Sequence, residues 1–459
     1  MFRRPLIVLL LPLVAACGGS SSSDASTDSL DSVPDPVDTV ETGDPLEELT
    51  AGLPDKPNVL LVLTDTLRAD RTSVYGHERD TTPWLNSWAE DAIVFEQALS
   101  ANAWTPPSVS ALFTGLYTSA HGVTALGLNA PSDDAVLASH HITLAELFQT
   151  AGYQTGAIVK SPVPRAEAGF DQGFNSMVTV DGKQAHSTSG EELVAAAKEW
   201  LGTHANASEP FFLYTHFMEP HAPYIAPEPY FEMHDEGYDS TVTGSYSQVL
   251  DFRNGNETFT NEDVLRLRAL YDGELTYWDQ QIQSLVGYLT ELNVQEETIV
   301  AFVGDHGEQF YEHGDWFHGA LYQENIHVPL IVQIPGVSGR RVAGPVQMID
   351  LTPTLAGLCG LEAVPHWQAR TLASAMVTGE TGSEPVYFEY GDDLGLLRQD
   401  GMKVTGVKGK AKLFDLSVDP TEQNDLSEDP AYQDLLEEMK AEVLSILTSS
   451  RALASELKP

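Results

Sequence analysis

The sequence predicts an α/β fold, with a mainly parallel central sheet covered by helices on both faces and a small C-terminal α+β subdomain. Two observations lead to this class. Short apolar runs typical of buried parallel strands alternate with longer helical segments. After about residue 383 the pattern changes to short strand-like pieces. The 459 residues allow one large domain with a smaller appendage.

The predicted strands of the central sheet are short apolar runs. The first covers residues 59–63 and ends at Thr64 and Asp65, and the others lie at 92–95, 157–159, 211–214, 299–303 and 328–332. Helices are expected between them, at 143–151, 191–201 and 262–292, the last with an apolar stripe at helical spacing. In such sheets the chemistry lies beyond the carboxyl ends of the strands.

The C-terminal segment has a different pattern. Strands are expected at 386–390, 403–407 and 412–416, followed by a closing amphipathic helix from about 430 to 447. We therefore predict a catalytic domain over residues 57–383 and a subdomain with a small antiparallel sheet over residues 384–459.

The N-terminus predicts export and lipid attachment. Arg3 and Arg4 precede an apolar run at 6–16, too short to span a bilayer, and small residues lead into Cys17. This pattern resembles a bacterial lipoprotein signal over residues 1–17, with Cys17 as the lipidated residue; an ordinary secretory peptide is the alternative. Residues 18–56, rich in Ser, Asp, Pro and Gly, are expected to form a disordered tether. We expect a lipid-anchored protein of the bacterial cell envelope, on the outer membrane and facing the periplasm or the cell surface.

The charge of the chain excludes one class of partner. Lys and Arg number 24 against 67 Asp and Glu, a formal net charge of −43. This charge repels polyanions, so we expect no nucleic acid binding. The other cysteine, Cys359, lies in an apolar helical segment and is expected to be a small core residue without a disulfide.

Three side chains that can bind a metal follow predicted strands. Asp65 comes directly after the first strand, and Asp305 and His306 follow the strand at 299–303 through Gly304. Carboxylate and imidazole groups gathered at one sheet edge suit a divalent cation. Taken singly, each has an ordinary structural explanation, since Asp at a strand end often caps a helix and a single His is usually a core or surface residue.

Thr105 stands before Pro106 and Pro107, a pattern typical of a helix start. One interpretation is a hydroxyl that only caps the helix. The functional interpretation uses the same position, because the unpaired amides and partial positive charge of a helix N-terminus favour an alkoxide and an anionic ester. A metal on the hydroxyl would favour the alkoxide further.

Four histidines lie in loops or at strand ends near these segments. His221 stands between two prolines after a predicted strand, where packing explains it poorly. It is expected to contact a substrate anion or to protonate a leaving group. His216, at the strand end, is more often a core residue, and His313 and His318 follow the pair at 305–306 by short loops.

Together these segments resemble the sulfatase family of the alkaline phosphatase superfamily. The similarity runs from Asn58 to about Leu426, and the order and approximate spacing of so many segments argue against chance. The matching stretches are residues 65–70, 73–76, 82–85, 108–115, 121–123, 152–155 followed by Lys160, 220–224, 304–308, 325–331, 350–355, 413–416 and 419–420.

The resemblance implies one divalent cation, with Ca²⁺ as the expected ion and Mn²⁺ or Zn²⁺ as alternatives. The family's metal positions are occupied by Asp65, Thr105, Asp305 and His306. The catalytic candidates are Thr105 at the nucleophile position, with His221 and Lys160 where the family contacts the substrate anion. Further candidates for substrate contact or a second metal are His318, His216 and Thr66.

The departures from the family bear on the chemistry. Sulfatases have Cys or Ser at the nucleophile position, oxidised to formylglycine, with Pro two residues on and Arg four residues on. Pro107 is present, but Val109 replaces the Arg. Thr105 cannot yield the aldehyde by that route, because its β-carbon carries a methyl group. Thr66 replaces the second Asp of the usual pair.

The expected function is a metal-dependent sulfatase-family hydrolase or transferase that acts on a sulfate or phosphate ester, with Thr105 as nucleophile and no formylglycine. Phosphate is favoured over sulfate, because an alkoxide nucleophile leaves a stable covalent sulfate that needs an external acceptor. One alternative is a phosphoethanolamine- or phosphoglycerol-type transferase, whose members use Thr with an Asp-His pair. Another is a non-catalytic surface lipoprotein on a sulfatase scaffold.

Overall fold

The computed structural model describes residues 43–124, 136–160, 166–180 and 190–458. The predicted signal segment, its Cys17 and the tether up to residue 42 lie outside the described residues. Among the described residues, no helix is long and apolar enough to cross a membrane.

The last part of the predicted tether is ordered. Residues Pro45–Thr50 form helix α1, which Asp44 caps at its N-terminus. Leu49 is buried, and Leu46, on the same side of the helix, packs against the same apolar core. The prediction of a tether is therefore wrong for this part, because two leucines three residues apart are enough to dock one helical turn.

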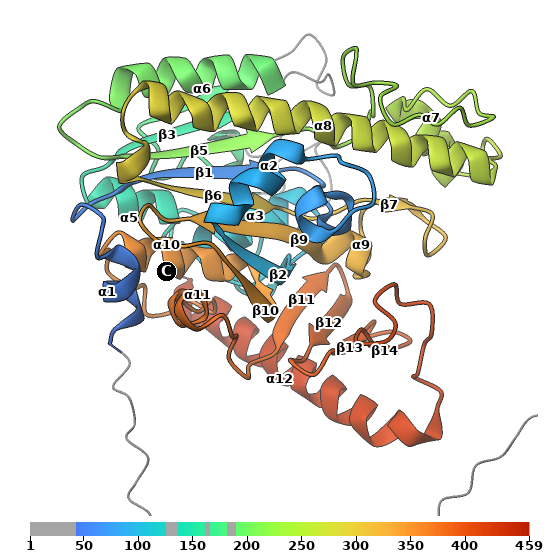
Figure 1. Cartoon of the computed structure of the whole chain (residues 1–459). Coiled ribbons are helices and arrows are strands. Elements are labelled where there is room, and N and C mark those ends of the chain that lie inside the picture. The colour runs from blue at the N-terminus through green and yellow to red at the C-terminus, as the bar shows by residue number, and fades with distance from the viewer. Residues whose placement is uncertain (1–42, 125–135, 161–165, 181–189, 459) are drawn as a thin grey trace, which may run out of the picture. The chain divides into compact units, whose positions relative to one another are not determined.

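An eight-stranded sheet lies at the centre of the described fold, in the order β10-β2-β9-β6-β1-β5-β3-β4 (Figure 1). Neighbours among β6, β1, β5, β3 and β4 run parallel, and β9 runs antiparallel to β6 and β2. The predicted mainly parallel α/β class is confirmed. The strands are β1 (Asn58–Thr64), β2 (Ile93–Leu99), β3 (Gln154–Val159), β4 (Ser176–Thr179), β5 (Phe211–Phe217), β6 (Thr298–Gly304), β9 (His327–Gln333) and β10 (Arg340–Gln347).

Helices cover both faces of this sheet. Val59 and Leu61 of β1 lie in one core with α3, α5 and α10, whereas Leu60 and Val62 lie in the other core with α6 and α8. Figure 1 shows α6 and α8 packed side by side across their face. Burial on both faces explains why β1 is apolar at consecutive positions. The helices of this part are α2 (Pro83–Trp88), α3 (Thr105–Thr114), α4 (Thr118–His121), α5 (Leu144–Thr150), α6 (Gly190–His204), α7 (Tyr246–Arg253), α8 (Asn261–Glu291), α9 (Gln323–Ile326), α10 (Leu351–Leu358) and α11 (Ala373–Thr378).

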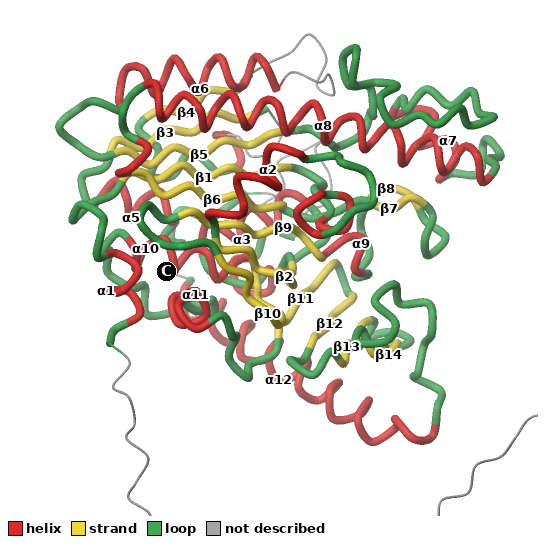
Figure 2. The backbone as a smooth tube through the Cα atoms, in the orientation of Figure 1, coloured by secondary structure: helices red, strands yellow, loops and turns green. Residues whose placement is uncertain are grey.

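The C-terminal part forms the predicted small antiparallel sheet and closing helix (Figure 2). Its elements are β11 (Val386–Tyr390), β12 (Asp393–Leu397), β13 (Met402–Thr405), β14 (Lys412–Asp415) and α12 (Gln433–Leu457). Strand β12 was not predicted, and α12 is ten residues longer than expected at its C-terminal end. Met439 and Val443 of α12 belong to the same apolar core as Val59 of β1.

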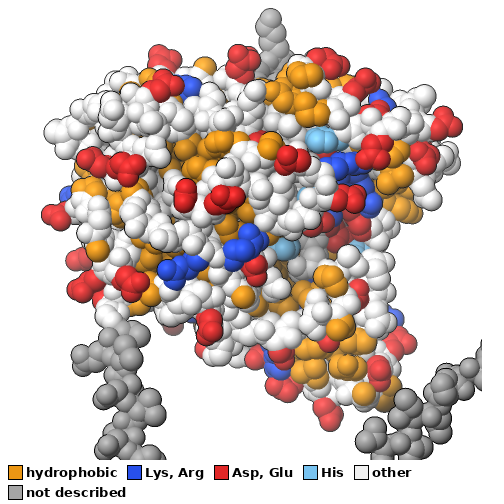
Figure 3. Space-filling view, in the orientation of Figure 1, with side chains coloured by type: hydrophobic (Ala, Val, Ile, Leu, Met, Phe, Trp, Pro, Cys, Tyr) orange, Lys and Arg blue, Asp and Glu red, His pale blue; other side chains and the backbone are white. Residues whose placement is uncertain are grey.

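Two further observations concern the surface and the cysteine. Asp and Glu side chains are spread over the face shown in Figure 3, far more widely than Lys and Arg. Cys359 is buried and carries a free thiol, as predicted.

Candidate active site

Three neighbouring parallel strands bring the predicted metal ligands together. Strands β5, β1 and β6 end at one edge of the sheet. Asp65 follows β1, Asp305 follows β6, and His216 is the last but one residue of β5. Carboxylate and imidazole groups from separate parts of the sequence therefore meet at this edge, where active sites of such sheets lie.

Asp65, Asp305 and His306 form a buried cluster that could hold a metal ion. One ligand atom from each residue lies within 4.8 Å of those of the other two. His306 Nε2 is 3.4 Å from Asp305 Oδ2 and 3.9 Å from Asp65 Oδ1. His216 Nε2 lies 3.7 Å from Asp65 Oδ2, so the structure also brings this lower-ranked candidate to the cluster.

Hydrogen bonds orient the ligands of this cluster. Asp305 Oδ1 accepts the backbone amides of Thr66 and His306 at 3.0 and 2.7 Å, which leaves Oδ2 for the centre. His306 Nδ1 lies 3.0 Å from the carbonyl oxygen of Gly307. A proton shared with that carbonyl leaves Nε2 unprotonated, so that its lone pair can face a cation.

The donor set fits a divalent cation. Asp65 Oδ1 and Asp305 Oδ2 are buried and have no hydrogen-bond partner among the described residues. In the same part of the chain, neither carboxylate forms an ion pair with Lys or Arg. Buried carboxylates without a cation are costly. Two hard oxygens and one imidazole nitrogen therefore match the requirements of a metal site.

The charges of the cluster act on one another. Burial and the negative charge of Asp65 hold the pKa of Asp305 well above its usual range. Burial also opposes ionisation of Asp65, but the hydrogen bond of His216 and the charges of His221 and His306 outweigh it and lower the pKa of Asp65. Burial lowers the pKa of His306 and so favours the neutral ring that a metal ligand must have.

Thr105 is the first residue of α3 and does not cap it. The cap position is held by Trp104, in an extended conformation and without a side-chain cap bond. The Thr105 hydroxyl instead lies 3.1 Å from His306 Nε2. One turn later, Ser108 Oγ donates to the carbonyl of Asp305 at 2.6 Å and ties α3 to the loop that carries Asp305 and His306. The interpretation of Thr105 as a capping residue is therefore wrong.

The imidazole rings of His306, His318 and His221 lie close together beside the cluster. The ring of His318 lies 4.5 Å from that of His306, 5.4 Å from that of His221 and 4.5 Å from the indole of Trp104, centroid to centroid. Burial lowers the pKa of both His221 and His318. Burial thus disfavours the protonated form of both rings.

Lys160 and Thr66 occupy the same edge of the sheet. Lys160 follows β3 and is buried, and its ammonium group has no hydrogen-bond partner among the described residues. Its backbone amide donates to the carbonyl of His216 at 3.0 Å. Thr66 has a left-handed backbone conformation, with a φ of 52°. Its backbone amide donates to Asp305, and the Tyr271 hydroxyl donates to the Thr66 carbonyl.

Sequence reasoning did not single out Glu308 and Tyr224, which the structure places beside the site. Glu308 Oε1 lies 2.9 Å from His318 Nδ1, and Tyr224 donates to Glu308 Oε2 at 3.1 Å. Arg68 adds a hydrogen bond of 2.8 Å to the Glu308 carbonyl. All three residues lie in segments that carried the family resemblance, but their pairing spans more than 80 positions and has no local pattern in the sequence.

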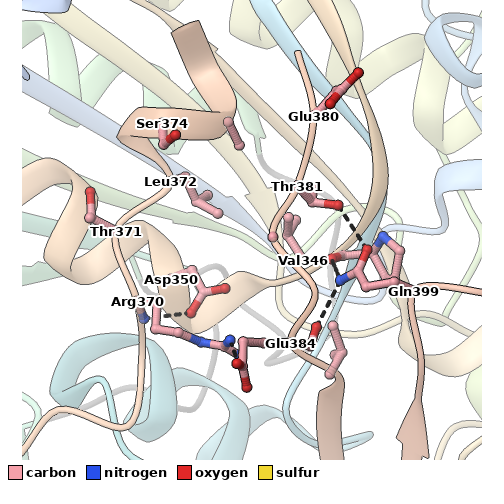
Figure 4. Close-up of a pocket in the computed structure, with 14 residues that line it drawn as sticks. Val346, Asp350, Arg370, Thr371, Leu372, Ser374, Glu380, Thr381, Glu384 and Gln399 are labelled. Carbon is pink, nitrogen blue, oxygen red and sulfur yellow. Dashed lines mark hydrogen bonds and ion pairs between the residues drawn. The ribbon is translucent and has the colours of Figure 1, made fainter. Parts of the chain in front are cut away.

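A separate cavity lies away from these residues. It has a volume of about 250 Å³ and is lined by β10, α11 and the segments around them (Figure 4). Its polar groups already bond one another: Thr381 donates to Gln399 at 2.8 Å, and the Arg370 amide donates to Asp350 at 2.8 Å. It contains none of the predicted site residues, so the sheet edge remains the candidate active site.

The described fold matches that of solved sulfatase-like structures, an alkaline phosphatase-like fold. The profile of the sulfatase family matches residues 57–361, and that of the N-sulphoglucosamine sulphohydrolase C-terminal region matches residues 311–449. The chain therefore belongs to the sulfatase family of ester hydrolases.

Named relatives agree with this family. The chain is 30% identical to the choline-sulfatase of Rhizobium meliloti over 240 residues, 48% of this chain and 47% of that protein. It is 24% identical to the arylsulfatase of Clostridium perfringens over 84% of this chain and 93% of that protein. The crystal structure of the phosphonate monoester hydrolase of Agrobacterium radiobacter superposes with a TM-score of 0.69 at 22% identity, covering 86% of this chain and 96% of that one.

Proposed function

We propose that this protein hydrolyses a sulfate or phosphate ester with Thr105 as the nucleophile. The observation that carries the proposal is the 3.1 Å separation between Thr105 Oγ1 and His306 Nε2, beside two buried carboxylates without a partner cation. A hydroxyl that only capped a helix would face the amides of its own first turn. Here it faces the metal-binding cluster.

Asp65, Asp305, His306 and the Thr105 hydroxyl would hold the cation. When bound, the cation would favour the Thr105 alkoxide and balance charge on the ester oxygens. Ca²⁺ is the ion that the family resemblance implies, and the imidazole of His306 also suits Mn²⁺ or Zn²⁺. The N-terminus of α3 adds partial positive charge beside the nucleophile.

His221 and Lys160 would bind the non-bridging oxygens of the ester. Lys160 supplies a buried ammonium group without a protein partner among the described residues, which suits an anion. The position of Val109, where the family has Arg, lies fully buried in the core and has no anion-binding group. Lys160 and His221 therefore take over the clamping of the anion.

Sulfate and phosphate esters share the tetrahedral anion that this site would bind. The names of the relatives, a choline-sulfatase and an arylsulfatase, favour sulfate. The Thr nucleophile favours phosphate, because its covalent ester must be resolved by a second attack. A substrate panel separates them, and it also reveals transfer to an added alcohol, the activity of a transferase.

The test replaces Thr105 with Ala and assays 4-nitrophenyl sulfate, 4-nitrophenyl phosphate and bis(4-nitrophenyl) phosphate, with and without chelator. We expect kcat/KM on the preferred ester to fall by at least about 10³-fold in T105A. Thr114→Ala, the same change at the buried far end of α3, is the matched control. Metal analysis of the wild type should find one divalent ion per chain. Equal turnover by T105A and wild type would exclude the nucleophile, and absence of any ion would favour a binding protein.

We also propose that Cys17 anchors the protein to the bacterial envelope through a lipid. The support is the sequence pattern of residues 1–17 alone. Full-length wild type should fractionate with membranes, and Cys17→Ser should be released. If the Ser variant stays with the membranes, the anchor is not Cys17.

A further inference from the structure

Two buried side chains of β5, a tyrosine and a histidine, lie in line beside Asp65. The Tyr214 hydroxyl is 2.8 Å from His216 Nδ1, and His216 Nε2 is 3.7 Å from Asp65 Oδ2. Tyr214 is 1% exposed and His216 is fully buried. The backbone amide of Asp65 also donates to the carbonyl of Phe217, the next residue of the strand, at 3.0 Å. The end of β5 therefore contacts both the backbone and the side chain of Asp65.

The tyrosine decides where the ring of His216 carries its proton. A tyrosine hydroxyl is protonated at neutral pH, and burial raises the pKa of Tyr214 further. Among the described residues, His216 Nδ1 is the acceptor that this hydroxyl reaches. Tyr214 therefore donates to Nδ1, and the ring carries its proton on Nε2. The opposite arrangement would leave the buried hydroxyl without an acceptor and would set a bare Nε2 against the negative carboxylate.

The two histidines that face Asp65 thus differ in tautomer. His306 Nδ1 lies 3.0 Å from the Gly307 carbonyl, an acceptor, so its Nε2 is left as a lone pair for a cation. His216 Nδ1 faces a donor, so its Nε2 is protonated and cannot bind a metal. In the described part of the chain, the ligand atoms within 4.8 Å of one another come from Asp65, Asp305 and His306, without His216. His216 can therefore act on the cation site through Asp65 but not as a ligand.

The two oxygens of Asp65 have different surroundings. Oδ2 faces His216. Oδ1 has no hydrogen-bond partner among the described residues and lies 3.9 Å from His306 Nε2. A carboxylate without a neighbour at Oδ2 could turn about its bond to Cβ and offer either oxygen. The N–H group of His216 favours the orientation in which Oδ1 faces the cation, and such outer contacts of a ligand raise metal affinity.

We propose that Tyr214 and His216 are positioning residues of the cation site. Tyr214 fixes the tautomer of His216, and His216 holds Asp65 with Oδ1 toward the cation. The ring of Tyr214 is itself held edge to face by Phe113 of α3, at 5.0 Å, which joins the pair to the helix that begins with Thr105. This inference rests on the cation site of the proposed function.

The test titrates the metal-free protein with Co²⁺ alone, whose visible absorption reports the ligands around the ion. His216→Leu fills the space without a donor and should raise the dissociation constant by about 10 to 100-fold. His216→Gln places an amide N–H near the position of Nε2 and should recover most of the affinity that H216L loses. Tyr214→Phe should raise the dissociation constant by a smaller factor than H216L. At saturation all three variants should keep the wild-type Co²⁺ spectrum, because no ligand has been removed.

The matched control is Tyr387→Phe. Tyr387 is fully buried in the small sheet, and its hydroxyl donates to Glu389 at 3.2 Å. This control loses a comparable buried hydrogen bond and should bind Co²⁺ as wild type does. Urea unfolding of each metal-free variant gives the folded fraction, to which the binding data are referred. Should H216L fail to fold, the comparison of Y214F with Y387F decides, and equal affinity of the two would overturn the proposal.

Other outcomes separate the possible errors. Equal loss of affinity in H216L and H216Q, with a changed Co²⁺ spectrum, would make His216 a ligand and overturn its positioning role. Wild-type affinity in H216L would also overturn it. Wild-type affinity in Y214F with weak binding in H216L would overturn the role of Tyr214 alone. A wild-type chain that binds no Co²⁺ would refute the cation site and this inference with it. Full turnover by T105A with normal Co²⁺ binding would instead refute only the proposed nucleophile.

Discussion

Two buried groups of charges in this protein contrast with one another. Asp272 in α8 is fully buried, and Arg71, Arg79 and His77 surround it, with arginine contacts of 2.7 and 2.8 Å. The cluster of Asp65 and Asp305 is equally buried but has imidazoles instead of arginines. The first group satisfies its charge with fixed side chains and stabilises the fold. The second leaves carboxylate oxygens open, which is the arrangement that a removable cation requires.

The most direct test of this difference between the two groups is the Asp305→Asn variant. Asn keeps the oxygen that accepts the amides of Thr66 and His306 but removes the charge that faces the centre. We expect metal affinity to fall by at least about 100-fold and turnover to be lost with it. Metal titration by calorimetry measures the affinity. If D305N binds one ion as tightly as wild type, the cation site is elsewhere.

The converse change is Asp272→Asn, which leaves Arg71 and Arg79 facing an uncharged amide. Loss of one partner from a buried ion pair costs about 3–5 kcal/mol of folding free energy. Urea unfolding should show this loss, while metal content per folded chain stays at the wild-type value. A destabilisation below about 1 kcal/mol, or loss of the metal, would show that the two groups are not separate in function.

Asp350 provides an intermediate case, a buried acid that accepts backbone amides, including that of Arg370 (Figure 4). Burial raises the pKa of Asp350 to about 6, from 3.8 in the unfolded chain. The folded state therefore binds the Asp350 proton more tightly than the unfolded state does. The resulting stabilisation of the fold is complete below about pH 4 and is lost as the pH rises to about 6. The loss should reach about 3 kcal/mol, since each pKa unit corresponds to about 1.4 kcal/mol.

The measurement for Asp350 is a series of urea unfolding curves between pH 4 and 7 for wild type and Asp350→Asn. The difference in stability between the two proteins should change in favour of the Asn variant as the pH rises. A constant difference across this range would mean that Asp350 titrates alike in the folded and unfolded states.

The central fold could be read from the sequence because its signals are local. Strands β1 and β6 are buried on both faces and are therefore continuous apolar runs. Strand β10 was missed because it lies at the sheet edge, where its sequence includes two arginines and a proline. Strand β12 was missed because Gly395 lies at its centre, directly against Phe388 of β11.

The site was predictable only in part, because only some of its residues are marked by a local pattern in the sequence. Asp65, Asp305 and His306 follow strands, so sheet topology alone brings them together. His216 was ranked as a core residue because a lone His at a strand end has no distinctive pattern, yet β5 neighbours β1 and brings it to Asp65. Glu308 contacts His318 and Tyr224, which only the folded chain makes its neighbours.

The core that α12 shares with the central sheet has a consequence for the order of folding. Val59 and Val443 belong to one apolar core although they are almost 400 positions apart, and the Ser119 hydroxyl of α4 donates to the Ser450 hydroxyl of α12 at 2.7 Å. Contacts of such long sequence separation form late, because a large loop must close first. During synthesis the sheet thus emerges long before the helix that completes its core. Until α12 arrives, one apolar side of the protein stays open, and this is the period in which a chaperone can hold the chain.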